Sequence, residues 1–216
     1  LSREGIRIIV FTFSPVSFKQ YQVGNKNLIV ETLFKRRVFT IVNFLHIILK
    51  RRFFRTHETA STRILLRGPL FPKRHNYLLE ILLSQPFSRS KKIYDWLRAF
   101  VGRLNGVSPQ IFESFNRYQP SLVISTHPTA TNEVEFLHCA RKLGVNTVGM
   151  IKSWDILTTK GYLPVPLDHY LVWNQVMQEE MMRMHQVSES QVTITGVPQF
   201  DPYADQTSIV KRSDFF

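Results

Sequence analysis

Short apolar runs alternate with amphipathic segments along most of the chain. Runs of strand length, rich in β-branched and aromatic residues, occupy residues 6–13, 27–33, 121–125, 146–151, 168–174 and 191–195. Between the later runs, apolar residues recur every three or four positions and predict helices over 109–119, 132–143 and 175–186. Strands that alternate with helices are typical of βαβ units. The pattern therefore predicts an α/β fold with an open parallel sheet and helices on both faces.

Helix boundary signals support this order of elements. Ser108 before Pro109 is a typical N-cap followed by proline at the first helical position. Asn132, with Glu135 three residues on, predicts the start of the next helix, and Gly144 predicts its end. Asn174 is the predicted cap of the last helix.

Residues 34–107 have a different character, with an apolar stretch at 38–49 between two basic clusters. The flanking cations are Lys35, Arg36, Arg37, Lys50, Arg51, Arg52 and Arg55. Such a segment is either a buried helix with solvated ends or an interfacial helix on anionic lipid. Helical spacing at 78–83 and 93–100 predicts further helices, so this region is expected to be a basic helical insertion over one face of the sheet.

Charge is distributed unevenly along the chain, whose net charge is +12. Residues 1–110 carry 20 Lys and Arg against 5 Asp and Glu (+15), whereas residues 111–216 carry 8 against 11 (−3). This asymmetry predicts an anionic partner, which could be a membrane surface, nucleic acid or a polyanionic polymer. Nucleic acid is the least favoured of these, because no nucleic-acid-binding motif is present. No apolar run reaches the roughly 18 residues of a membrane span. The only cysteine, Cys139, excludes an intrachain disulfide, so we expect a cytoplasmic protein, peripheral on the inner face of the plasma membrane.

Polar residues follow the predicted strands where ligands bind in open α/β sheets. The expected substrate-binding residues are Thr126, Asn132, Ser153, Trp154, Lys160, Asn174, Gly196 and Gln199. Asp155 and His127 are the expected catalytic residues, and the ring of Trp154 would raise the pKa of Asp155. The alternatives are that Asp155 caps a turn or pairs with Lys160, and that His127 only shapes its turn before Pro128.

Several kinds of site are missing from the sequence. It contains no glycine-rich phosphate loop, no HExxH zinc motif and no Gly-x-Ser-x-Gly nucleophile elbow. We therefore expect neither a metal site nor a resident cofactor.

Residues 192–201, Val-Thr-Ile-Thr-Gly-Val-Pro-Gln-Phe-Asp, follow the 174–185 helix and, further upstream, Ser153-Trp154-Asp155. Together they resemble the end of the N-terminal domain of GT-B glycosyltransferase-like proteins. The related groups are CDP-glycerol glycerophosphotransferases, UDP-GlcNAc 2-epimerases and Kdo transferases. The resemblance is good over residues 108–203 and weaker over 1–107.

This resemblance implies a division of the chain and of the protein it comes from. Residues 1–203 would form a Rossmann-like N-terminal domain, in which the basic helical region 34–107 faces the acceptor. Residues 204–216 would be the start of an interdomain linker. The chain does not begin with Met, and we expect a fragment whose C-terminal, donor-binding domain is absent and which is inactive alone.

The implied function is transfer of a sugar from a nucleotide-sugar, a co-substrate bound by the missing domain, to a glycan or lipid-linked acceptor of the cell envelope. Two alternatives stay open. One is a sugar-nucleotide epimerase or polyol-phosphate transferase of the same fold, and the other is a non-catalytic module that binds an anionic membrane or nucleic acid.

Overall fold

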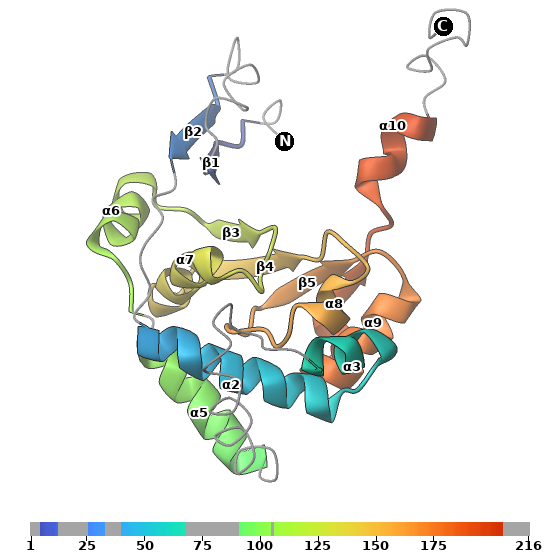
Figure 1. Ribbon diagram of the computed structural model, residues 1–216. Coiled ribbons are helices and arrows are strands. Elements are labelled where there is room, and N and C mark those ends of the chain that lie inside the picture. Colours follow the sequence, from blue (N-terminus) through green and yellow to red (C-terminus); the bar gives the residue numbers. More distant parts are fainter. Residues whose placement is uncertain (1–4, 13–25, 33–39, 68–90, 105, 205–216) are drawn as a thin grey trace, which may run out of the picture.

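The computed structural model describes residues 5–12, 26–32, 40–67, 91–104 and 106–204. It is an α/β structure in which parallel strands are flanked by helices (Figure 1). The predicted fold class is therefore confirmed.

The main sheet has four parallel strands that follow one another in sequence and in space. They are β3 (Leu122–Ser125), β4 (Asn146–Met150), β5 (His169–Val172) and β6 (Val192–Ile194), in the order β3-β4-β5-β6. All three pairings are parallel. Parallel strands place their carboxyl ends on one edge, so the loops after β3, β4, β5 and β6 share that edge.

Helix α6 (Pro109–Tyr118) and helix α9 (Gln175–His185) begin at the predicted caps. The hydroxyl of Ser108 accepts from the backbone N–H of Ile111, and the Asn174 side chain accepts from that of Met177 at 3.0 Å. These side chains satisfy backbone donors that a helix start leaves without partners.

The prediction for the start of α7 (Thr131–Lys142) was wrong. Its N-cap is Ala130, with no side-chain bond to the helix, so Asn132 lies inside the first turn. The carboxylate of Glu135, three residues after Asn132, accepts from the backbone N–H of Ser108 at 3.3 Å. The end of α7 is as predicted, because Gly144 takes the left-handed φ of +68°.

Strands β1 (Ile8–Thr12) and β2 (Leu28–Thr32) are parallel neighbours, as predicted, but they form a sheet of their own within the described residues. They pack against α6 rather than extend the four-stranded sheet. Arg7 donates to the carbonyl of Tyr118 at 3.1 Å, and the Tyr118 hydroxyl donates to the carboxylate of Glu31. The sequence predicted a single continuous sheet. Hydrophobic periodicity does not reveal tertiary contacts such as those of Arg7 and Glu31 with Tyr118.

Helices α2 (Thr40–Thr56) and α5 (Lys91–Leu104) lie side by side below the four-stranded sheet in Figure 1. Helix α2 runs beyond the predicted apolar stretch and includes the second basic cluster. Val101 and Leu97 of α5 pack with Leu49 and Phe54 of α2 in one buried cluster. The predicted helix at 78–83 lies outside the described residues.

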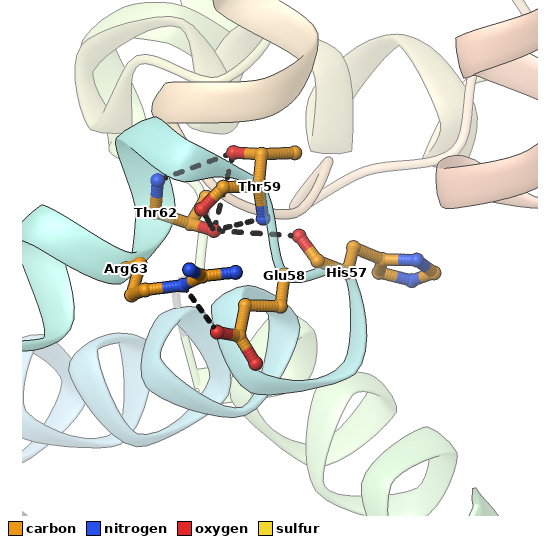
Figure 2. Close-up of polar contacts among 5 residues, drawn as sticks. All are labelled: His57, Glu58, Thr59, Thr62 and Arg63. Carbon is orange, nitrogen blue, oxygen red and sulfur yellow. Dashed lines mark hydrogen bonds and ion pairs between the residues drawn. The ribbon is translucent and has the colours of Figure 1, made fainter.

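The turn from α2 into α3 (Ala60–Leu66) is fixed by a capping box. Thr59 accepts from the N–H of Thr62, and Thr62 accepts from the N–H of Thr59, as Figure 2 shows. Thr62 is fully buried, and Arg63 pairs with Glu58 at 2.8 Å. The His57 ring points away from this network.

The largest core cluster joins the main sheet to the segments around it. Tyr170 and Val172 of β5 pack with Leu137 of α7, Leu157 of the short helix α8 (Ile156–Thr159) and Met181 of α9. After β6 the chain continues through the 3-10 helix η4 (Pro198–Phe200) into α10 (Asp201–Ala204), and η3 (Glu189–Gln191) precedes β6. This core holds α8, and with it the loop after β4, in place.

Candidate functional site

The loop after β3 is tied to the first turn of α7 by one carboxylate. Glu133 accepts from the hydroxyl of the buried Ser125 at 2.5 Å and from the backbone N–H of His127 at 3.2 Å. His127 is half-buried, whereas Thr126 is exposed. Glu133 was not predicted, although an acidic residue in a first helical turn was a signal for such a role.

The loop after β4 is organised around Asp155. Its carboxylate accepts from the Ser153 hydroxyl at 2.5 Å and from the Thr159 hydroxyl at 3.0 Å. The ammonium of Lys160 lies 3.8 Å from the same carboxylate. The ion pair that the sequence offered as an alternative role for Asp155 is therefore present.

The pKa of Asp155 is lowered, mainly by the hydrogen bond from Ser153, and not raised as expected from the sequence. The reason is that Trp154 does not bury the carboxylate, because its own side chain is 69% exposed. Asp155 is thus an ionised hydrogen-bond acceptor at neutral pH and is poorly suited to be a general acid.

His127 and Asp155 lie near enough for their charges to interact. Burial and the charge of Lys152 lower the pKa of His127, with a smaller contribution from Lys160, while Glu133 and Asp155 act in the opposite direction. The imidazole is therefore neutral at pH 7 and able to accept a proton. Lys152, two residues after the end of β4, is an exposed member of this group that the predicted site residues did not include.

Lys50 belongs to this edge of the sheet as well as to α2. Its side-chain stem covers Gly161, where an added Cβ would lie 2.7 Å from the Lys50 Cγ. Burial, followed by the charge of Lys160, lowers the pKa of Lys50. The lysines around His127 and Asp155 make this part of the strand edge electropositive.

Three of the predicted substrate-binding residues belong to a second group, at the ends of β5 and β6. Asn174 uses its side-chain oxygen to cap α9, Gly196 provides a left-handed turn with φ of +75°, and Gln199 is exposed in η4. The Trp173 and Phe200 rings lie 6.3 Å apart beside them. The side chain of Asn132 lies outside the described part of the molecule.

The second basic cluster, Lys50 to Arg55, is less exposed to solvent than the sequence predicted. Arg51 is 1% exposed and Arg52 is 9% exposed, because α2 is packed from several sides. These two side chains are therefore not placed to contact a membrane in this structure, which corrects the expectation. Arg55 is half-buried, and Lys35, Arg36 and Arg37 lie outside the described residues.

Within the described ranges, no three His, Cys, Asp or Glu residues are grouped as metal ligands would be. Over the same ranges, no helix combines the length and apolar character needed to cross a bilayer.

The parallel strands flanked by helices form a Rossmann-like domain, consistent with one half of a GT-B fold. Residues 52–198 match the family model described as monogalactosyldiacylglycerol (MGDG) synthase, and the chain belongs to this family. The match confirms the glycosyltransferase prediction, while the three groups of relatives named from the sequence are not confirmed by it. No curated protein and no solved structure matches the chain.

Proposed function

We propose that this domain is the acceptor-side half of a glycosyltransferase that moves a sugar from a nucleotide-sugar to a lipid at a membrane surface. The name of the family supports a lipid acceptor, because monogalactosyldiacylglycerol is a diacylglycerol that carries one galactose. The nucleotide-sugar would be bound mainly by a second domain of the full-length protein.

The observation that carries the proposal is an exposed apolar stripe along α5, formed by Ile93, Trp96, Phe100 and Leu104. These four side chains are between 38% and 62% exposed. At about 100° per residue they fall within an arc of about 80° on the helix. The Trp96 and Phe100 rings stack with centroids 5.4 Å apart and an interplanar angle of 6°.

The stripe is bordered by cations, as in helices that lie in a membrane interface. Lys92 and Arg103 flank it on one side, and Asp95 is the only acidic residue of α5. On the other side, Leu97 and Val101 are buried and fix the helix to α2. In this proposal α5, rather than the two basic clusters around residues 38–49, contacts the membrane, on its cytoplasmic side.

In this proposal the acceptor hydroxyl reaches the edge of the main sheet where His127 and Asp155 lie. His127, neutral at pH 7, would accept the hydroxyl proton. Asp155, already ionised and held by Ser153 and Thr159, would position the acceptor rather than transfer a proton. Lys152 and Lys160 would favour anionic groups nearby.

Vesicle binding of the chain tests the membrane assignment. Wild type should bind phosphatidylglycerol-containing vesicles more tightly than phosphatidylcholine vesicles, and added salt should weaken binding. The double change Trp96→Ser and Phe100→Ser should weaken binding about tenfold or more, because buried aromatic area is lost. Phe112→Ser is the control, since Phe112 is 47% exposed on α6, away from the stripe.

Equal binding by the α5 variant and wild type would refute the membrane assignment. The transferase part is tested separately, by incubating the full-length protein with diacylglycerol vesicles and a panel of nucleotide-sugars. Label from the sugar should appear in the lipid; label transferred only to water, or only to a soluble acceptor, would refute a lipid acceptor.

A further inference from the structure

A second candidate site lies in the helical layer, away from the strand ends. It is a cavity of about 230 Å³ between α2, α5, the segment after α8 and the end of α9. Phe53, Tyr94, Tyr162 and Met184 supply much of its wall. Tyr94 and Tyr162 meet edge to face with centroids 6.4 Å apart. An apolar, aromatic wall of this size suits the body of a small organic molecule.

Three of the four charged side chains that line this cavity, among the described residues, are cations. The cations are Arg52, Lys91 and Arg98, and the carboxylate is that of Asp95. The guanidinium carbon of the nearly buried Arg52 lies 5.0 Å from the centroid of the Tyr94 ring. The cavity therefore holds an excess of positive charge beside groups that are removed from water.

Arg98 is close to the buried groups that surround the cavity. Its charge acts on the pKa of Tyr94, Tyr162 and His185, all three of which are strongly shifted by burial. Charges interact more strongly at such sites than in water. The positive charge of Arg98 would therefore stabilise an anion in the cavity more strongly than it would in water.

The two histidines of the cavity do not add to its positive charge at neutral pH. Burial is the main cause that lowers the pKa of His185 to about 4, and burial with the nearby Arg183 and Arg52 lowers that of His57. The His185 ring donates to the carbonyl of Leu157 at 3.0 Å and packs 5.0 Å from the Phe53 ring. The ring of His57 points away from the capping box of α3 (Figure 2).

We propose that this cavity binds a small organic oxyanion, that is, a phosphate or carboxylate group attached to an aromatic or short apolar body. Two guanidinium groups provide planar donors that match such oxyanions. The aromatic wall accepts the apolar body. This site is distinct from the strand-end residues, and its existence does not depend on the proposed transferase activity.

Phenyl phosphate is the probe, with inorganic phosphate and phenol as its two halves. Methionine-methyl NMR of the chain should show the Met184 signal shifting with phenyl phosphate while that of Met150, in β4, stays unchanged. Titration should give at least tenfold weaker binding for inorganic phosphate and no saturable binding for phenol. Arg98→Gln should weaken binding of phenyl phosphate about tenfold or more, and Lys142→Gln, which removes an exposed charge on α7, should not.

A second variant protects the test from a folding defect in Arg98→Gln. Lys91→Gln changes an exposed residue at the start of α5 and should weaken phenyl phosphate binding about threefold. The proposal is overturned if phenyl phosphate leaves Met184 unshifted, if phenol binds as tightly as phenyl phosphate, or if both charge variants, folded, bind like wild type. Because no sugar donor or lipid is present, this outcome is independent of the proposed function.

Discussion

At the scale of single residues, two aspartates with lowered pKa values have different surroundings. Asp155 accepts from Ser153 and Thr159 at the carboxyl edge of the sheet and lies near Lys160. Asp168 precedes β5 at the opposite edge and accepts from both the N–H and the hydroxyl of Thr147, at 2.8 and 2.7 Å. The surroundings of Asp155 permit contact with a ligand, while Asp168 serves the connection between β4 and β5.

Asp155→Asn should therefore lower turnover of the full-length enzyme with little loss of stability. The amide still accepts from Ser153, and the lost pair with Lys160 is partly exposed and worth less than about 1 kcal/mol. A roughly 10- to 100-fold drop in kcat/KM is expected, because the charge that positions the acceptor is removed. Steady-state kinetics and thermal unfolding would measure the two effects.

Asp168→Asn is the matched control for that substitution. It should lower the unfolding temperature, because a buried backbone N–H loses a charged acceptor, and leave turnover per folded molecule unchanged. Wild-type turnover in Asp155→Asn would remove Asp155 from the site.

At the scale of elements, local signals predicted the later half of the chain well. The caps at Ser108 and Asn174 and the stop at Gly144 are side-chain and backbone properties that act within a few residues, so the sequence contains them. The start of α7 was missed because the loop before it is held by Glu133 instead of a cap.

Burial of basic side chains was the main feature that the sequence did not reveal. Arg51 and Arg52 were expected at a surface, but both are buried. Arg52 lies against the ring of Tyr94, which is more than 35 residues away in sequence. In the same way, the spacing of Ile93, Trp96 and Phe100 predicted a helix but not which of its faces would stay exposed. The burial of a side chain and the exposed face of a helix depend on which helices and strands pack together. The periodicity of a single sequence does not specify that packing.

The central strand β4 offers a prediction about packing. Gly149 is buried, and a Cβ there would lie 2.8 Å from Leu167 Cδ1 and 3.2 Å from Tyr170 Cδ1. Tyr170 is 1% exposed, and its hydroxyl accepts from the N–H of Leu167, so the pair has little room to move.

Gly149→Ala should therefore destabilise the domain by about 1–3 kcal/mol through overpacking. Urea denaturation measures the change in the free energy of unfolding. Asn146→Ala, at the exposed start of the same strand, should have a much smaller effect, and a stable Gly149→Ala variant would contradict the packing described here.

At the scale of the whole molecule, positive charge and buried histidines occur together in the helical layer. Helices α2 and α5 each carry four Lys and Arg residues, and both helices line the cavity. His138 of α7 and His185 of α9 face the same layer, and burial is the largest cause that lowers the pKa of each to about 4. The fold therefore keeps both imidazoles neutral where cations already gather.

This arrangement predicts loss of stability on acidification. The unfolded chain protonates these histidines near pH 6.5, whereas the folded chain does so only near pH 4, so between these values the unfolded state binds more protons. The free energy of unfolding should fall as the pH falls through this window, by roughly 2–3 kcal/mol for the largely buried His185. Urea denaturation at pH 7 and pH 5 should show the decline, and His185→Gln, which still donates to the Leu157 carbonyl, should reduce it.

Met184→Leu is the control, because it perturbs the same packing without removing a titrating group and should keep the full decline. If the free energy of unfolding of His185→Gln fell with pH as steeply as that of wild type, His185 would not be the source of the decline.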